Sequence, residues 1–352
     1  ATDGCAPFAL AFSPLDQVAE SIDVALDGDD AILLSATYYG LVDFGGGPLG
    51  AANSNPAAAI AKFSPTGAHH WSRAVLADQI TLARPSSDGH GNVLLAGIFV
   101  GSLRIGDVAI ATSTDHLIDG FVAMLDPSGT LVWSRILRLS SYQKFATPIS
   151  VAAWPEGDVA VAGRFVHESS EPLDLGGGPM GSSESQSGYV ASFDAFGQHR
   201  WDKLVDPLVT DAAVAPSSGD LVVLGVWDGN GFPLQRFDRS GTPSALVITA
   251  APEGTPSLAV SADGEALIAI ALPPTAGKCG IFSTAVAASG ETLWTKMVNP
   301  PDGLQSYRVA AAFGPEGTPL LAGGFTGAMD LGTGAVAAEA GQPDIFVAGV
   351  AP

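Results

Sequence analysis

The chain has 352 residues, of which 47% are hydrophobic and only 14% charged, and it contains 43 glycines and 25 prolines. This composition is typical of many short strands joined by tight turns and argues against a disordered chain. The 36 acidic residues outnumber the 15 basic ones, and the net charge of −21 disfavours nucleic acid and anionic lipid as partners. The longest apolar runs are far shorter than the roughly 20 residues of a membrane span, so no membrane insertion is expected.

A pattern with a period of about 45 to 65 residues recurs along the chain, and its second copy is the clearest. A short alternating strand at 80–83 precedes a turn and a hydrophobic strand at 93–97. A long connection leads to a third strand at 121–125, and a Pro-Ser-Gly turn then precedes a fourth strand that contains Trp133. Because Gly accepts positive φ and Asp or Ser bonds the local backbone, these turns favour hairpins. Each unit is therefore expected to form four antiparallel strands.

The second-strand segment with its preceding turn recurs six times, and these copies set the number of units. They lie, in chain order, at 29–35, 88–97, 157–163, 219–225, 264–269 and 317–323. The corresponding units span approximately 18–75, 76–136, 137–205, 206–249, 250–298 and 299–352. Radial repetition of four-stranded units protects sheet edges. The sequence thus predicts one all-β domain over 1–352, a six-bladed β-propeller with four-stranded antiparallel blades.

The two ends of the chain are expected to share one blade. The last unit stops after a third strand at 344–350, whereas residues 7–12 precede 15–17 much as the strand with Trp71 precedes 76–79. Phe8 takes the place of the tryptophan. We therefore expect the segment 5–13 to complete the last blade as its outer strand and to close the ring.

The copies resemble a bacterial β-propeller repeat family found in exported proteins. Its middle motif, Val-Asp-Phe-Gly-Gly-Gly, is matched at 42–47, 173–178 and 329–332, while Arg104 replaces the Asp in the second unit and the fourth and fifth units lack the motif. The resemblance covers nearly the whole chain. It implies an exported or surface-associated propeller, and it carries no defined catalytic residues to this sequence.

The long connections of such blades fall on one face, which is the default place for a binding site. They lie within units at 38–56, 100–119, 166–187 and 326–343, and between units at 138–148 and 299–307. The inner strands are expected to begin at the mouth of the central channel with Ser21, Gln79, Thr147, Asp211, Ser257 and Arg308. The candidate ligand-binding residues are Gln79, Asp211, Tyr307 and Arg308. Asp211 and Arg308 are the most suggestive pair, either as ligand contacts or as a structural ion pair.

Other polar clusters have a structural interpretation that competes with metal binding. Asp43, Asp174 and Asp330 recur in separate blades, which indicates turn residues instead of a convergent carboxylate site. The run 27–30 is rich in oxygen ligands but lacks the spacing of a helix-loop-helix calcium site, so a hairpin turn is expected. The histidines at 69, 70, 90 and 199 fall near tight turns of the opposite face without a partner that closes a zinc site. No metal and no cofactor is predicted.

Two further sets of residues have expected structural roles. The tryptophans at 71, 133, 201 and 294, with Phe8, mark one repeat position and are expected to pack between blades. Cys5 and Cys279 are expected not to form a disulfide. Their aligned positions lie at opposite ends of strands of about 17–20 Å, whereas a disulfide tolerates Cα atoms up to about 7 Å apart.

The expected function is that of a non-catalytic binding or adhesion module, because nucleophile elbows, zinc-binding His-Glu-x-x-His and phosphate loops are absent from the sequence. The low cysteine and lysine content and the lack of a leader pattern suggest an exported chain that starts after a removed leader or at a boundary. We expect an extracellular or cell-surface monomer that binds a protein, peptide or glycan. A propeller hydrolase or lyase with its site at the channel mouth is the alternative. A structural repeat segment of a larger surface protein is another.

Overall fold

The computed structural model describes thirteen stretches of the chain. They are 19–50, 55–112, 118–137, 145–166, 172–181, 186–206, 208–275, 278–298, 309–313, 317–325, 328–330, 335–337 and 344–349. All regular secondary structure in these stretches is β-strand. Among them there is no helix with the length and apolar character needed to cross a membrane. The chain divides into two compact units, Ala1–Leu208 and Val209–Pro352.

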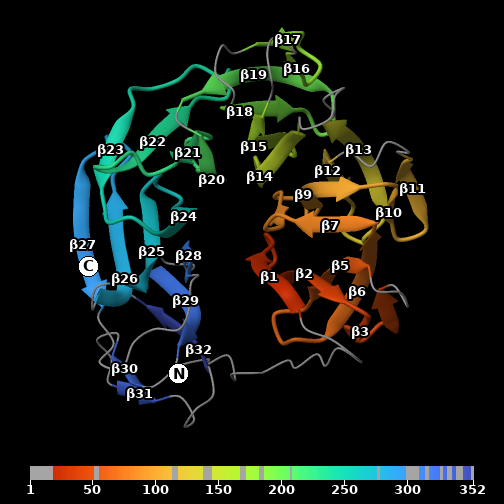
Figure 1. Cartoon of the computed structure of the whole chain (residues 1–352), viewed down its shortest axis with the longest axis horizontal. Helices are drawn as coiled ribbons and strands as arrows, with labels where there is room; N and C mark the ends of the chain where they lie inside the picture. The colour runs from red at the N-terminus through yellow and green to blue at the C-terminus, as the bar shows by residue number, and fades with distance from the viewer. Residues whose placement is uncertain are drawn as a thin grey trace. The chain divides into compact units, whose positions relative to one another are not determined.

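Three antiparallel sheets follow one another along the first unit (Figure 1). The first contains β1 (Ala19–Leu26), β2 (Ile32–Tyr39), β5 (Pro56–Phe63) and β6 (His69–Leu76). The second contains β7 (Gln79–Leu82), β9 (Val93–Val100), β12 (Ile118–Leu125) and β13 (Leu131–Leu137), with β8 (Ser86–Ser87) beside β9. The third contains β14 (Phe145–Ala153), β15 (Val159–Val166), β18 (Gln186–Phe193) and β19 (His199–Val205). Each sheet is an up-and-down meander of four main strands.

Short hairpins fill the connections between the second and third strands of these sheets. They are β3 (Leu41–Asp43) with β4 (Pro48–Gly50), β10 (Leu103–Ile105) with β11 (Val108–Ala111), and β16 (Leu173–Asp174) with β17 (Pro179–Met180). The hairpin of the second sheet also reaches the first sheet, because Ile105 in β10 pairs with Val75 in β6. This pairing covers the edge of an outer strand that would otherwise offer unpaired backbone groups to another chain.

The second unit repeats the same plan. One sheet contains β20 (Val209–Val214), β21 (Leu221–Gly225), β22 (Gly231–Phe237) and β23 (Val247–Ala250). The next contains β24 (Thr255–Val260), β25 (Ala266–Thr275), β26 (Lys278–Val286) and β27 (Thr292–Val298). The last contains β28 (Val309–Phe313), β29 (Pro319–Phe325) and β32 (Asp344–Gly349). Along the chain, a separate hairpin of β30 (Ala328–Asp330) and β31 (Ala335–Ala337) lies between β29 and β32.

The repeated four-stranded sheets confirm the all-β class and the blade-like repeat that the sequence predicts. Both units are propeller-like in this sense, since four-stranded meanders of this kind are the blades of β-propellers. The segment 5–13, expected to close the last blade, lies outside the described residues. The same holds for Cys5, whereas Cys279 lies near the start of β26.

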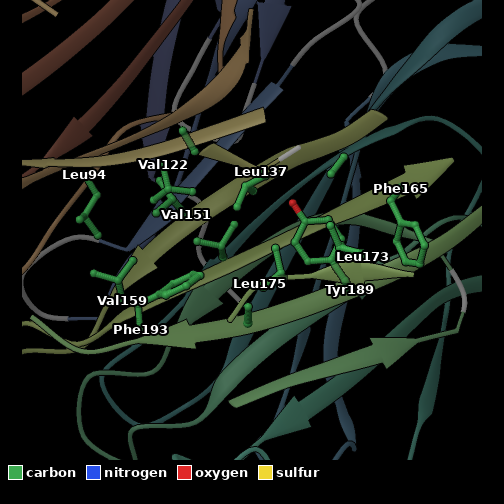
Figure 2. Close-up of a cluster of buried hydrophobic side chains, with 14 of the residues drawn as sticks. Leu94, Val122, Leu137, Val151, Val159, Phe165, Leu173, Leu175, Tyr189 and Phe193 are labelled. Carbon is green, nitrogen blue, oxygen red and sulfur yellow. The ribbon is translucent and has the colours of Figure 1, made fainter. Parts of the chain in front are cut away.

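The core of the first unit lies between successive sheets. Figure 2 shows one such cluster, in which Leu94 and Val122 of the second sheet meet Val159 and Phe193 of the third. The alternate residues of β9, such as Leu95, point into another cluster, with the first sheet. Both faces of the central strands β9 and β12 are therefore buried, which explains why these two strands read as almost continuous apolar runs.

A pair of side chains on an outer strand joins one sheet to the next, and we call this pair with its target turn the turn clasp. In the first sheet, Trp71 Nε1 donates a hydrogen bond to Pro127 O at 2.8 Å. Arg73 Nε donates to Gly129 O at 2.9 Å, and its guanidinium lies 5.6 Å from the Trp71 ring centroid. The acceptors belong to the turn between β12 and β13, so the first sheet holds a turn of the second.

The turn clasp recurs in the next sheet of the same unit. Trp133 Nε1 donates to Ala195 O at 3.0 Å, and Arg135 Nε donates to Gly197 O at 2.6 Å. These bonds confirm for Trp71 and Trp133 the predicted packing between blades. In the second unit Val247 lies against Gly290 as Trp71 lies against Gly129. A Cβ added to either glycine would be 2.7 Å from the facing side chain.

Two buried cations, Lys62 and Arg236, also reach from one sheet to the next. Each is the penultimate residue of the third strand of its sheet, β5 for Lys62 and β22 for Arg236. Lys62 Nζ lies 2.6 Å from Asp27 Oδ2 and 3.4 Å from Gly91 O, and the Asp27 side chain is 0% exposed. Arg236 Nη2 donates to Gly264 O at 2.8 Å. Both glycines belong to the turn that precedes the second strand of the following sheet, so each cation caps that turn.

Replacement of Tyr189 by phenylalanine is expected to leave stability unchanged or to raise it by about 1 kcal/mol. The Tyr189 hydroxyl is buried and makes no hydrogen bond within the described part of the chain, and burial raises the pKa of the phenol. Phe121 occupies the matching place in the second sheet. The urea midpoint of unfolding checks this expectation. A clear loss of stability would show that the hydroxyl has a partner.

Candidate functional site

A cleft of about 490 Å³ opens between the first and second sheets of the first unit, and we call it the rim cleft. It is lined by Tyr39, Asn55, Pro56, Asp78, Gln79, Ile80, Thr81, Ile98, Phe99, Val100 and Ile118. These residues come from the end of β2, the start of β5, the β6–β7 link, β7, the end of β9 and the start of β12. The rim cleft thus lies where the long second-to-third connections leave the sheets.

The backbone fixes the two most polar rim residues. Asp78 lies in the short link between β6 and β7, Gln79 begins β7, and Asp78 N donates to Val100 O at 3.0 Å. Gln79 pairs with Val100 in the sheet. Gly101 has φ +79°, and a Cβ there would lie 2.2 Å from Asp78 Oδ2. Position 101 therefore requires glycine for two reasons: glycine accepts the left-handed backbone, and it leaves room for the Asp78 carboxylate.

The rim cleft combines an apolar wall with mainly neutral polar groups. Ile80 and Phe99 are buried beneath it, whereas the side chains of Asp78, Gln79 and Thr81 are exposed. Asp78 is the only charged residue in the described part of the lining. Amides, hydroxyls and one carboxylate can donate and accept several hydrogen bonds, and the volume lies in the roughly 300–1,000 Å³ range of ligand sites.

Two of the four candidate residues, Gln79 and Asp211, are described, and their surroundings differ. Gln79 lines the rim cleft. Asp211 lies in β20 of the second unit, where Oδ1 accepts from Ala212 N at 2.8 Å and Oδ2 from Leu258 N at 2.9 Å. The bond from Leu258 N joins β20 to β24. Tyr307 and Arg308 lie outside the described residues, so the pairing of Asp211 with Arg308 stays a prediction.

Gln79 and Asp211 stand at different register positions in the first strands of their own sheets. Gln79 pairs with Val100, beyond the repeat glycine at 97, whereas Asp211 pairs with Leu224, before the repeat glycine at 225. The physical reason lies in irregular first strands. The first strand of the second sheet is broken into β7 and β8, and the register of β20 shifts between Val209 and Asp211.

Two of the three repeated aspartates of the middle motif act as turn residues, as predicted. Asp43 Oδ1 accepts from Gly45 N at 2.7 Å and Gly47 N at 2.9 Å, and these bonds lower the pKa of Asp43. Asp174 Oδ1 accepts in the same way from the backbone N–H groups two and four residues later. Asp330 ends β30.

The run 27–30 also forms a hairpin turn, as predicted. Asp27 Oδ1 accepts from Asp29 N at 3.0 Å and from Ala31 N at 2.9 Å. These bonds orient the carboxylate toward its own turn. The described part of the chain contains no group of three His, Cys, Asp or Glu side chains placed to hold a metal ion.

His69 and His70 line a second, wider hollow of about 740 Å³ beside β6. Its polar groups are largely engaged with the protein. His69 Nε2 lies 3.2 Å from Ser72 Oγ, and the Arg73 guanidinium donates to the carbonyls of Ser72, Ser128 and Gly129. The rim cleft is the better candidate, because its exposed amide and carboxylate face solvent.

The sequence did not single out the other members of the rim cleft. Tyr39, Asn55 and Ile118 flank two long connections, and only the alignment of three different strands brings them beside Gln79. One local signal was present. Asp78 directly precedes Gln79, in the link between the first and second sheets, where a loop residue has room to face a ligand.

The fold and the rim cleft define a class: an all-β protein built from repeated propeller-like sheets, with a polar cleft between two of them. No protein-family model matches the chain, and no curated protein matches it in sequence. Among solved structures, a protein of unknown function from Dyadobacter fermentans is similar with a TM-score of 0.54 at 13% identity, over 90% of this chain and 95% of that one. At this identity the similarity concerns the fold alone.

Two further structures are similar at a lower level. Hydrazine synthase from Kuenenia stuttgartiensis has a TM-score of 0.43 at 13% identity, over 69% of this chain. The matched region spans only 55% of the hydrazine synthase chain. A subtype N11 neuraminidase-like protein of A/flat-faced bat/Peru/033/2010 has a TM-score of 0.49 at 9% identity, over 94% of this chain and 87% of that one.

Proposed function

We propose that the protein is an exported or cell-surface binding module without catalytic activity, and that it holds its ligand in the rim cleft. The observation that carries this proposal is the convergence of side chains from two successive sheets around one open cleft. Gln79, named from the sequence as a ligand-binding candidate, is one of them. Rigid sheets with a polar cleft at their loop ends are a common basis for binding sites.

The proposal includes the complete architecture. Six repeat units with the segment 5–13 as the outer strand of the last one make a closed six-bladed propeller, and a closed ring has no free sheet edge. The resemblance of the repeats to an exported bacterial family supports the extracellular or cell-surface location. The net charge of −21 supports a partner that is neutral or basic, whether protein, peptide or glycan.

The test uses the full chain and two substitutions in the rim cleft, Gln79→Ala and Ile118→Trp. The first removes an exposed amide, and the second fills space at a side chain that is 38% exposed. Neutral oligosaccharides, cationic peptides and divalent metal ions serve as probes in a thermal-shift screen, followed by calorimetric titration of each probe that raises Tm. A probe at 100 times its Kd is expected to stabilise the protein by about 2.7 kcal/mol.

Both cleft variants are expected to weaken the binding of the active probe at least about tenfold, which corresponds to about 1.4 kcal/mol. Gln198→Ala is the matched control, because Gln198 is exposed and lies in the turn between β18 and β19, outside the lining of the rim cleft. A probe that binds both cleft variants as tightly as the wild type would contradict the proposal.

A further inference from the structure

The lining of the rim cleft carries information about the chemistry of its ligand. Its polar groups are two primary amides, Asn55 and Gln79, two hydroxyls, Tyr39 and Thr81, and the carboxylate of Asp78. Among the lining residues that the structure describes there is no Lys, Arg or His. An anionic ligand would therefore meet one negative charge, no compensating cation, and the field of a chain with net charge −21.

A cationic ligand is also a poor fit, because the ion pair that it could form is too weak. Asp78 is exposed, and an ion pair at an exposed carboxylate contributes only about 0–1 kcal/mol and weakens with salt. Binding a cation strongly would need more carboxylates or several aromatic faces around it. The described lining residues supply one carboxylate and two aromatic rings, and one of these rings, Phe99, is only 1% exposed. Charge is thus a minor contributor in this cleft.

A neutral polyhydroxylated ligand matches the lining better. Each amide offers a donor pair and an acceptor, and a carboxylate accepts from two adjacent hydroxyls at once. Hydrogen bonds to a charged acceptor are worth roughly 1.5–3 kcal/mol each. The partly exposed side chains of Ile98, Val100 and Ile118 add apolar surface, which can cover the C–H faces of a sugar ring.

On the basis of the proposed function, we infer that the rim cleft binds a neutral saccharide, with Gln79 and Asp78 bonding ring hydroxyls at one side and Asn55 at the other. Asp78 and Gln79 lie at the β6–β7 link, whereas Asn55 directly precedes β5. The ligand therefore contacts two successive sheets. This arrangement requires both amides for full affinity, and it makes binding insensitive to ionic strength.

The experiment measures binding of glucose, galactose, mannose and N-acetylglucosamine and of their disaccharides to the full chain by calorimetric titration, at low salt and at high salt. Glucuronic acid is the matched anionic probe, and an oligolysine peptide is the cationic one. We expect at least one neutral sugar to bind with a salt-independent Kd, and its glucuronic counterpart to bind at least about tenfold more weakly. Gln79→Ala and Asn55→Ala should each weaken the sugar about tenfold or more.

Asp78→Asn should weaken sugar binding about tenfold or more, because the amide keeps only one of the two acceptor oxygens and loses the charge. Asp107→Asn, at another exposed aspartate of the same unit, is the control and should leave the Kd unchanged. The saccharide inference would be overturned if no sugar binds while oligolysine binds in a salt-dependent way that Asp78→Asn abolishes. That result would still uphold a ligand site in the rim cleft. Sugar binding that survives Gln79→Ala, Asn55→Ala and Ile118→Trp would overturn both the inference and the proposed function.

Discussion

Replacement of Lys62 by methionine is expected to destabilise the protein by about 3–5 kcal/mol, because it leaves the Asp27 carboxylate buried without its partner. Lys62 Nζ lies 2.6 Å from Asp27 Oδ2, and the two side chains are 7% and 0% exposed. The same ammonium also caps the turn of the second sheet through Gly91 O. The shift of the urea midpoint, followed by tryptophan fluorescence, measures the loss.

The size of this loss should depend on pH in a defined sense. Burial alone would raise the pKa of Asp27, but the Lys62 ammonium and the N–H groups of Ala31 and Asp29 outweigh it and lower the pKa. In the wild type, the stabilisation is present above the ordinary pKa of about 3.9 and is lost as the pH falls through the lowered one. In Lys62→Met the pKa of Asp27 rises, so its carboxylate becomes protonated and neutral at a higher pH in the variant than in the wild type. The difference in the free energy of unfolding between the two proteins should therefore shrink as the pH falls.

A double variant provides the control for Lys62. Asp27→Asn together with Lys62→Met removes both charges, and it is expected to recover most of the stability that Lys62→Met loses, since a neutral pair carries no unpaired buried charge. Equal losses in the single and double variants at neutral pH would mean that the bond of the Lys62 ammonium to Gly91 O, and not its ion pair with Asp27, holds the two sheets together.

Replacement of Trp71 by alanine is expected to cost about 3–5 kcal/mol, the usual range for the loss of a buried aromatic side chain. Trp71 is 7% exposed, donates to Pro127 O and carries the Arg73 guanidinium over its ring. Its ring also lies against Gly129, where an added Cβ would be 2.7 Å from the indole. Chemical denaturation of the full chain measures the effect.

Two milder variants separate the contributions within this turn clasp. Trp71→Phe keeps an aromatic ring but removes the indole N–H, and is expected to cost about 1–3 kcal/mol because a carbonyl loses its donor. Gly129→Ala keeps the indole, yet meets both the close contact and a φ of +77°, and should also destabilise. Unchanged stability in Gly129→Ala would show that the turn can move away from Trp71.

The all-β class and the four-stranded repeat were predictable because several signals within one repeat agree. In the second copy, a hydrophobic strand at 88–97, turn residues at fixed offsets and Trp133 two strands later all point to the same four strands. The register of the first strands was not predictable to the residue. The break between β7 and β8 and the shift in β20 arise from packing between strands, and neither leaves a distinctive local pattern.

The candidate site was predictable only in part, for a physical reason. The face was inferred from the long connections, and Gln79 from its place at the start of an inner strand. The remaining lining comes from strand ends far apart in the sequence, such as Asn55 and Ile118. Their proximity depends on how two sheets pack. Asp211 carried the same kind of sequence signal as Gln79, yet its oxygens bind backbone N–H groups of β20 and β24.

The spacing of the turn clasps bears on how such a chain can grow in evolution. Trp71 and its acceptor are 56 residues apart, Trp133 and its acceptor 62. Both separations are close to one repeat, so the second sheet supplies the donor strand of one clasp and the acceptor turn of the clasp before it. A tandem duplication of that segment would therefore copy a donor strand and an acceptor turn together, and two successive copies could form a clasp of the same kind between them.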